Sequence, residues 1–99
     1  MRRRGRVDAN QKAIVAALRQ VGASVQSLAD IGHGCPDLLV GFRGRTLLFE
    51  VKDGSKVKSA RALTPDEEAW IGAWEGAPVF VVESVEQAIQ TVTFEEGEC

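Results

Sequence analysis

Two short apolar segments on either side of a glycine-containing turn constrain this chain more than any other feature. The first covers residues 38–42, the second covers residues 46–52, and Arg43-Gly44-Arg45 lies between them. Segments of this length that are rich in Leu, Val and Phe and are joined by a glycine turn are typical of a β-hairpin. We therefore expect the sheet of this protein to be built around that hairpin.

The second hairpin strand has a different character on each face. Side chains alternate along a strand, so Leu47, Phe49 and Val51 share one face, while Glu50 and Lys52 share the other. The apolar face should enter the core. The opposite face should present a carboxylate and an ammonium together at the end of the strand.

Helices and further strands are predicted around the hairpin. Asp8, with Gln11 three residues later, fits a capping box at the start of a helix that Gly22 ends. Thr64, a proline at the next position and Glu67 form a second, stronger helix start. In chain order we predict a helix at 8–21, a weak strand at 23–28, the two hairpin strands, a helix at 64–75, a strand at 79–82 and a helix at 84–92.

This α-β-β-β-α-β-α order predicts a mixed α/β fold with helices packed on a mixed central sheet. Residues 79–82 are continuously apolar, so their strand should be buried on both faces. Trp70 and Trp74 stand at helical spacing, which favours a place in the core over stacking on nucleic-acid bases.

The charges of the chain are divided between its two halves. Residues 1–61 hold all 12 Lys and Arg with five acids, which gives +7, and residues 62–99 hold nine acids and no base, which gives −9. The basic half suggests a polyanionic partner, most simply nucleic acid, although solvated surface charge is the plainer alternative for any single residue. The candidate phosphate contacts are Arg2, Arg3, Arg4, Arg6, Lys56, Lys58 and Arg61.

Length and composition limit the class of protein. A chain of 99 residues fits one domain, here 1–99, with a basic arm at 1–7 and an acidic tail at 94–99. The sequence has no apolar run long enough for a transmembrane helix and no signal-peptide pattern. Cys35 and Cys99 are too few for a disulfide framework, so we expect reduced thiols and a cytoplasmic location. Cys35 is expected to be a small, semi-buried residue without chemistry.

Asp37 stands at the mouth of the first hairpin strand, and the register decides whether it meets the charged face of the second. A three-residue loop centred on Gly44 places Asp37 opposite Val51, on the wrong face. A two-residue loop that begins at Gly44, which suits a type II′ turn, places Asp37 opposite Lys52. Glu50 is then a diagonal neighbour at about 7–8 Å. A bulge near Asp37 would have the same result.

Two carboxylates so close together repel each other unless a cation lies between them. Carboxylate oxygens are suited to Mg²⁺ or Mn²⁺, and Mg²⁺ usually takes one or two carboxylates together with water and substrate phosphate. The sequence thus predicts a metal site that includes Asp37 and Glu50, and no small-molecule cofactor. The alternative is a cross-strand ion pair between Asp37 and Lys52 with a solvated Glu50.

Residues 34–37 end in Pro36-Asp37, and the triplet Glu50-Val51-Lys52 begins thirteen residues after Asp37. This pattern resembles the motif of PD-(D/E)xK nucleases. From about residue 8 to residue 82, the chain is similar to the small stand-alone nucleases of phages and bacteria in the VRR-NUC group. Besides the motif, the similarity rests on the first helix and on residues 38–41, 48–54 and 63–65.

The resemblance implies a restriction-endonuclease-like α-β-β-β-α-β core, here with an added C-terminal helix. It implies a DNA endonuclease that hydrolyses phosphodiester bonds with Mg²⁺ or Mn²⁺. Asp37, Glu50 and the backbone carbonyl of Val51 would hold the metal. Lys52 would orient or deprotonate the attacking water, or neutralise charge in the transition state.

The chain departs from the family pattern at two positions. Family members usually carry a glutamate in the first helix, where this chain has Asn10 and Gln11. Gln11 could ligate the metal through its amide oxygen or could simply belong to the capping box. The family often has a glutamine shortly after its Ser/Thr-Pro, where this chain has Glu67, which we interpret as a helix cap. With two carboxylates, one metal ion is favoured over two.

Further expectations concern partners and substrate. A globule of this size has a radius of gyration of only about 13 Å, and two-fold pairing would match two DNA strands of opposite polarity, so a homodimer is predicted. The resemblance points to branched, Holliday-junction-like DNA in phage or bacterial replication or repair, in the cytoplasm of a bacterium or an infected host. A non-catalytic DNA-binding or adaptor module on the same fold is the alternative.

His33 precedes the motif, but a lone loop histidine more often has no catalytic role.

Overall fold

The computed structural model describes residues 10–94 of the chain. The expected order of helices and strands is confirmed, with one additional short 3₁₀ helix before the second α-helix. The elements are α1 (Gln11–Gln20), β1 (Ser24–Ser27), β2 (Leu38–Phe42), β3 (Arg45–Val51), η1 (Lys58–Arg61), α2 (Pro65–Ala73), β4 (Val79–Val82) and α3 (Val85–Thr93).

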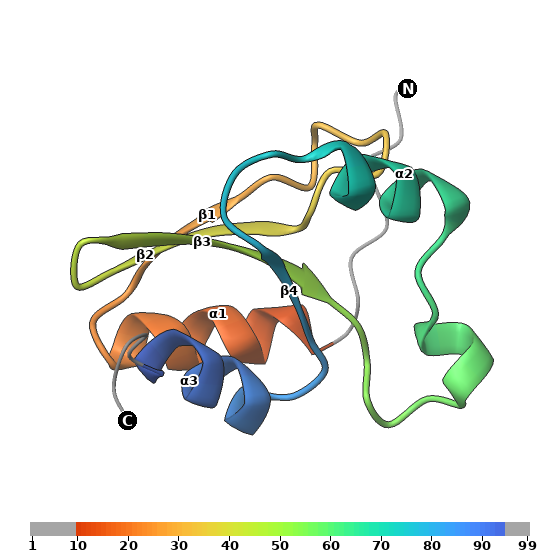
Figure 1. Cartoon of the computed structure of the whole chain (residues 1–99). Coiled ribbons are helices and arrows are strands. Elements are labelled where there is room, and N and C mark those ends of the chain that lie inside the picture. The colour runs from red at the N-terminus through yellow and green to blue at the C-terminus, as the bar shows by residue number, and fades with distance from the viewer. Residues whose placement is uncertain (1–9, 95–99) are drawn as a thin grey trace.

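The four strands form one mixed sheet in the order β1-β2-β3-β4. The pairs β1–β2 and β2–β3 are antiparallel, whereas β3 and β4 run parallel. A parallel pair needs a crossover, and the segment that contains η1 and α2 supplies it. Figure 1 shows α1 and α3 together on one face of the sheet and α2 on the opposite side.

The hairpin turn differs from both turns considered from the sequence. Phe42 pairs with Arg45, so the loop consists of Arg43 and Gly44, with φ values of 51° and 80°. Positive φ at both positions is characteristic of a type I′ turn, whose twist matches that of the flanking strands. The expected placement of Asp37 opposite Lys52 or Val51 is therefore wrong, because neither register occurs. The ladder instead runs to a Leu38–Phe49 pair, and Asp37 directly precedes it.

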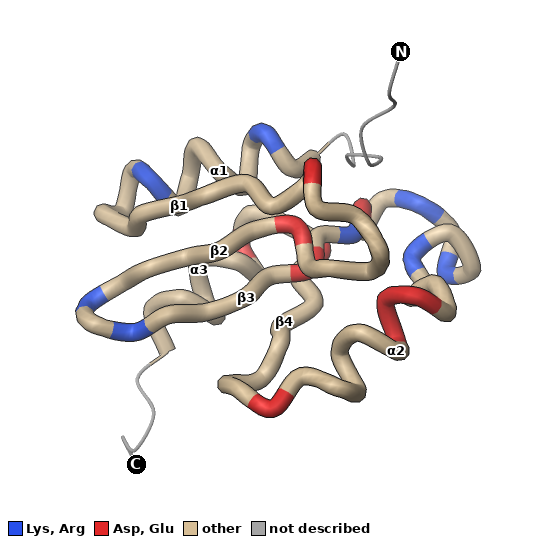
Figure 2. Tube along the Cα trace, turned by 90° about the horizontal axis from the view of Figure 1, so that it is seen from above, with Lys and Arg blue, Asp and Glu red and all other residues tan. Residues whose placement is uncertain are grey.

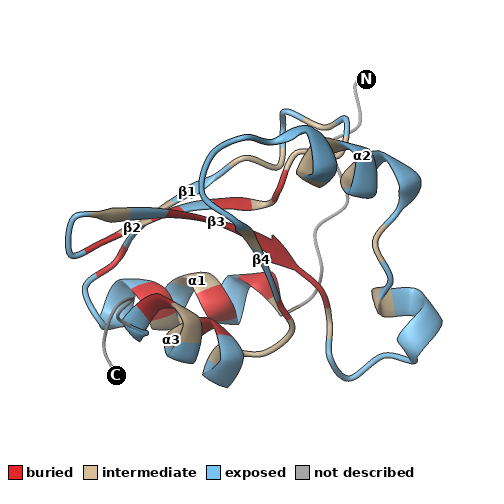
Figure 3. Cartoon of the chain, viewed as in Figure 1, coloured by how far each residue is buried: buried red, intermediate tan, exposed pale blue. Residues whose placement is uncertain are grey.

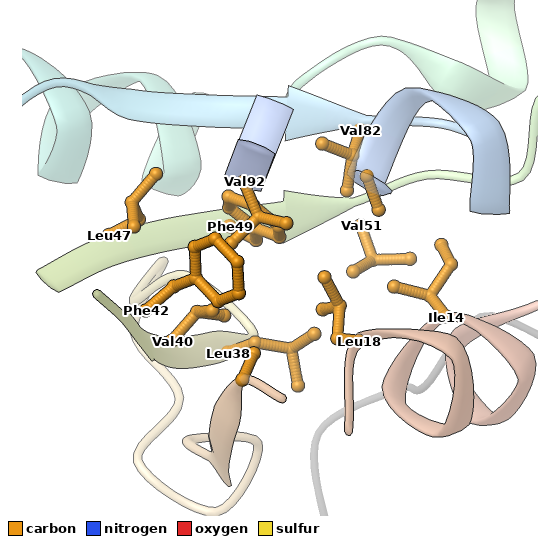
Figure 4. Close-up of a cluster of buried hydrophobic side chains, with 12 residues drawn as sticks. Ile14, Leu18, Leu38, Val40, Phe42, Leu47, Phe49, Val51, Val82 and Val92 are labelled. Atoms are coloured by element: carbon orange, nitrogen blue, oxygen red, sulfur yellow. The ribbon is translucent and has the colours of Figure 1, made fainter. Parts of the chain in front are cut away.

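The core lies between the sheet and the pair α1 and α3 (Figure 4). The alternation predicted for the second hairpin strand is confirmed, because Leu47, Phe49 and Val51 are all buried in this cluster. Ile14 and Leu18 enter the cluster from α1. Figure 3 shows the same distribution, with buried segments on the sheet and on the inner sides of α1 and α3.

The face of the sheet that α2 covers is packed less completely. The prediction that Trp70 and Trp74 belong to the core is wrong: Trp74 is 45% exposed and α2 has no buried residue. The two indoles stack on each other with centroids 4.8 Å apart. A cavity of about 420 Å³ remains beside them, lined in part by Leu39 and Leu48 of the sheet. The spacing of the tryptophans indicated an apolar helix face but could not show how closely that face approaches the sheet.

The prediction that residues 79–82 are buried on both faces is also wrong. β4 is an edge strand of the described sheet, Phe80 and Val81 are 36% and 40% exposed, and Val82 is its buried residue. An apolar run shows that a strand can be buried, but strand order decides whether a neighbour covers it. The edge position therefore leaves apolar side chains at the surface.

Several expectations fall outside the described residues. These are the capping role of Asp8, the arm at 1–7 with Arg2, Arg3, Arg4 and Arg6, and the acidic tail beyond Phe94 with Cys99. Within residues 10–94, none of the helices has the length and apolar character needed to cross a membrane.

Candidate active site

Asp37 is held against the end of β3 by two hydrogen bonds. Its backbone N–H donates to the carbonyl of Phe49 over 3.0 Å, and its Oδ2 accepts the N–H of Val51 over 2.7 Å. The carboxylate therefore takes a position beside the segment that carries Glu50. Asp37 and Glu50, which the sequence placed at one strand mouth, are brought together.

Glu50 and Lys52 are both buried at this strand end, with exposed fractions of 2% and 8%. The Lys52 Nζ lies 3.6 Å from the Glu50 Oε2. The Glu50 Oε1 is buried without a hydrogen-bond partner. Burying charged groups is costly unless they are paired, and an unpaired carboxylate oxygen in this setting is an unsatisfied acceptor. The part of the predicted alternative that left Glu50 solvated is therefore wrong.

Glu67 belongs to the same cluster, although the sequence suggested only a helix cap. It does form the predicted capping box with Thr64 at the start of α2. Its Oε1 also accepts a hydrogen bond from the Lys52 Nζ over 2.8 Å. The sequence offered one signal, because this chain has a glutamate where the family it resembles often has glutamine. A capping-box pattern does not indicate, however, that the same side chain also reaches the end of a strand.

The carboxyl groups of the cluster have shifted pKa values. Burial is the main reason why the pKa of Glu50 is raised to about 9. The charge of Asp37 raises it further, as do the hydrogen bond and the charge of Glu67, whereas the Lys52 ammonium lowers it. Burial alone would raise the pKa of Glu67 too, but its hydrogen bonds with Lys52 and the Thr64 backbone hold it below its ordinary value. Without a cation, the site therefore favours a protonated Glu50 beside an ionised Glu67.

The N-terminus of α1 reaches the same end of the sheet. The Asn10 Nδ2 donates to the carbonyls of Lys52 over 3.0 Å and of Glu83 over 3.1 Å, which ties α1 to the ends of β3 and β4. Gln11 follows directly, and it is buried with its Oε1 unpartnered. Asn10 is the N-cap of α1 and makes no side-chain cap hydrogen bond. Gln11 is thus the first helical residue, not the third, so its proposed capping-box role is wrong.

The donor set of this cluster fits a hard divalent cation. The described residues contain no group of three or more His, Cys, Asp or Glu side chains arranged as metal ligands. The buried, unpartnered oxygens of Glu50 and Gln11 nevertheless accompany Asp37 at one end of the sheet. Mg²⁺ prefers oxygen ligands and usually needs only one or two carboxylates from the protein.

The basic residues after β3 lie in the crossover that leads to α2. Figure 2 shows the basic segments of this crossover close to the acidic start of α2. Lys56 and Lys58 are exposed. Arg61 differs, because it donates to the Glu83 Oε1 over 3.0 Å and to the carbonyl of Lys56 over 2.9 Å. Arg61 therefore has a structural partner already.

His33 and Cys35 occupy the loop that leads into the motif. His33 is exposed and has a φ of 57°. Cys35 is half-buried, as expected. Burial raises the pKa of its thiol, and the charges of Asp37 and Glu50 raise it further. Cys35 is therefore kept as a neutral thiol, which is a weak nucleophile.

The mixed sheet carries α1 on one face and α2 on the other, and an aspartate and an acid-x-lysine triplet lie at one hairpin mouth. This combination is that of restriction-endonuclease-like nuclease folds. No family model and no curated protein matches the chain. A solved structure described as a VRR_NUC domain does match, with 32% sequence identity, a TM-score of 0.57, and coverage of 83% of this chain and 88% of that chain. The chain belongs to the VRR-NUC family, and it has the restriction-endonuclease-like fold expected from that resemblance.

We predict that the buried Glu50 makes the metal-free protein less stable as the pH rises. The pKa of Glu50 is raised above its unfolded value of about 4.3, so its contribution is fully present below that value. The contribution is lost as the pH rises towards the folded value of about 9. In EDTA, Glu50→Gln should therefore be more stable than the parent at pH 8, with a melting temperature higher by at least about 5 °C. The difference should vanish near pH 4.

Thermal unfolding across this pH range measures the effect. The exposed Glu86 on α3 offers a matched control, and Glu86→Gln should follow the parent at each pH. Parallel stability curves for Glu50→Gln and the parent would contradict the raised pKa.

Proposed function

We propose that this protein is a Mg²⁺- or Mn²⁺-dependent DNA endonuclease that hydrolyses phosphodiester bonds, with the whole chain 1–99 as one nuclease domain. The observation that carries the proposal is the Glu50 carboxylate, which is buried beside Asp37 with one oxygen unpartnered in a VRR-NUC chain. Ionising a carboxyl group buried in this way is costly for stability. A bound cation would offset that cost.

Asp37, Glu50 and the Val51 carbonyl are the proposed metal ligands, with Gln11 as a neutral fourth. When bound, the cation would polarise the scissile phosphate and lower the pKa of a coordinated water. Asp37 is oriented for this role by the N–H of Val51, which fixes one of its oxygens. Gln11 is brought towards the site because Asn10 anchors the start of α1 to the Lys52 carbonyl.

Lys52 is the proposed third catalytic residue. It makes a charged ion pair with Glu67, so it would enter the reaction as an ammonium. An ammonium can donate hydrogen bonds to the attacking water and to the phosphate oxygens, where it neutralises developing charge. This geometry favours orientation and charge neutralisation over proton abstraction as the role of Lys52.

DNA affinity is proposed to come from two groups of basic residues, the lysines of the crossover and the N-terminal arginines. Lys56 and Lys58 are exposed a few residues after Lys52, so they could contact phosphates on either side of the scissile bond. The N-terminal arginines Arg2, Arg3, Arg4 and Arg6 would add phosphate contacts. Arg61 is proposed to contribute more by holding the crossover to Glu83 than by direct contact.

We further propose that the nuclease acts as a homodimer on branched DNA. The described residues have a radius of gyration of 13.3 Å, which is small compared with a DNA junction. Two copies related by a two-fold axis would present two sites to strands of opposite polarity. The exposed apolar side chains of the edge strand β4 are available surface for such an interface.

Cleavage should require both proposed carboxylate ligands and the lysine. We expect the parent to cut labelled DNA with Mn²⁺ or Mg²⁺ and not in EDTA, on a panel of branched and linear substrates. Asp37→Asn and Glu50→Gln should each weaken Mn²⁺ binding in calorimetry by at least about tenfold. Lys52→Met should keep Mn²⁺ binding and lose about 10²-fold or more in cleavage.

The exposed Lys12 and Glu86 provide matched controls, and Lys12→Met and Glu86→Gln should cut like the parent. Salt-dependent DNA binding without cleavage under any metal condition would indicate a binding module, and neither binding nor cleavage would indicate an adaptor. Unchanged Mn²⁺ affinity in both Asp37→Asn and Glu50→Gln would refute the metal site.

Replacing Lys56 and Lys58 together with glutamine should weaken DNA binding. The slope of log affinity against log salt concentration should become shallower by about one unit for each phosphate that the protein no longer neutralises. Titration of labelled DNA at several salt concentrations measures the slope, with Lys12→Gln as the control. A slope equal to that of the parent would show that these lysines are solvated surface.

Light scattering should give twice the mass of one chain at micromolar concentration, because the exposed apolar surface of β4 favours pairing. A charge placed on this surface, as in Val81→Glu, should shift the equilibrium to the single chain without unfolding it. A parent of single-chain mass with and without DNA would contradict the dimer and favour a monomeric nicking enzyme.

A further inference from the structure

Glu67 makes contacts beyond those that a helix cap requires. The capping box at the start of α2 uses the Glu67 N–H, which donates to the Thr64 Oγ1 over 3.2 Å, and the Glu67 Oε1, which accepts the Thr64 N–H over 2.9 Å. The same Oε1 accepts a hydrogen bond from the Lys52 Nζ over 2.8 Å. One carboxylate therefore joins the first turn of α2 to the lysine of the motif.

The first turn of α2 is also fixed against the loop that carries the motif. A Cβ atom placed on Gly34 would lie 2.2 Å from the Asp66 carbonyl oxygen and 3.0 Å from the Glu67 nitrogen. The backbone of α2 can approach this closely because residue 34 is glycine, whose φ of +84° also suits glycine. Glu67 is thus held in place from two sides, through Gly34 and through its own cap.

The Lys52 ammonium lies between two carboxylates at unequal distances. Its Nζ is 2.8 Å from the Glu67 Oε1 and 3.6 Å from the Glu50 Oε2. The shorter contact belongs to a residue that has no proposed part in binding the metal. If Glu67 were neutral, the ammonium would be drawn to Glu50, where it would compete with a cation for the same carboxylate.

We propose that Glu67 is a positioning residue that engages the Lys52 ammonium and so leaves the Glu50 carboxylate to the metal. This inference deepens the proposed function and rests on it for the identity of the metal ligands. Glu67 would thereby separate two roles within the motif. Glu50 would serve the cation, and Lys52 would remain available to the substrate.

The first test uses the metal-free protein and the substitution Glu67→Gln. Glutamine keeps the capping box, because its side-chain oxygen can accept the Thr64 N–H, but it removes the charge. Correlation spectra of the ¹⁵N-labelled lysine ammonium groups should show a protected Lys52 signal in the parent, assigned by its loss in Lys52→Met. That signal should shift or broaden in Glu67→Gln and stay in place in Glu68→Gln, since Glu68 is exposed in the same turn.

A second variant reaches Glu67 from the other side. Gly34→Ala should push the first turn of α2 away and move the Lys52 signal. Gly32→Ala is its matched control, because Gly32 also has a positive φ, of +72°, but nothing lies within 4 Å of a Cβ atom there. Thermal unfolding of each variant checks that it is folded.

The second test is a double-mutant cycle on Mn²⁺ affinity, measured by calorimetry. Glu67→Gln should weaken Mn²⁺ binding about five- to tenfold in the parent, and less than about twofold when Lys52 is already methionine. An effect that acts simply through the removed negative charge would be the same in both backgrounds. The cycle therefore separates action through Lys52 from direct attraction of the cation.

The outcomes are distinct. No protected Lys52 signal in the parent, a signal that Glu67→Gln leaves unmoved, or an equal loss of Mn²⁺ affinity in both backgrounds would each overturn the inference. A parent that binds no Mn²⁺ would refute the proposed function, whereas the ammonium spectra would still decide whether Glu67 engages Lys52.

Discussion

The burial of Glu50 and Lys52 at the end of β3 is the constraint on which the rest of this structure depends. Both are less than a tenth exposed, on the sheet face opposite the core. Charged groups in such a place need partners, and the surrounding elements give Lys52 a carboxylate but leave one Glu50 oxygen without a hydrogen-bond partner. The loop before β2 brings Asp37, the first turn of α2 brings Glu67, and the start of α1 is tied to the strand ends by Asn10.

This arrangement lowers the stability of the fold, which is common at functional sites. Burial and neighbouring charge raise the pKa of Glu50 to about 9, so the folded chain favours the protonated form of this carboxyl group, whereas the proposed cation would favour its ionised form. Functional sites often concentrate shifted pKa values and unsatisfied polar atoms, and the remaining fold must be stable enough to tolerate them. Here the core beneath β3 provides that stability from the opposite face of the same strand.

Local patterns predicted the hairpin and the starts of α2 and α3 because those structures are stabilised by neighbours in sequence. The capping box of Thr64 and Glu67 and the Ser84 cap are examples, since each bonds within three residues. Predictions that depended on distant neighbours were less accurate. Trp70 was expected in the core, but no sequence pattern states how closely α2 approaches the sheet. Val81 was expected to be buried, but strand order left β4 at an edge.

The sequence by itself determined that Glu50 and Lys52 share one strand face and that Asp37 stands at the mouth of the paired strand, because alternation along a strand is a local property. Only the tertiary structure decided the rest of the site. A type I′ turn set a hairpin register that differs from the two registers expected from the sequence. The close approach of α2 at Gly34 brought Glu67 to Lys52 across fifteen residues of chain. Such contacts arise from the packing of separate elements, so no single segment encodes them.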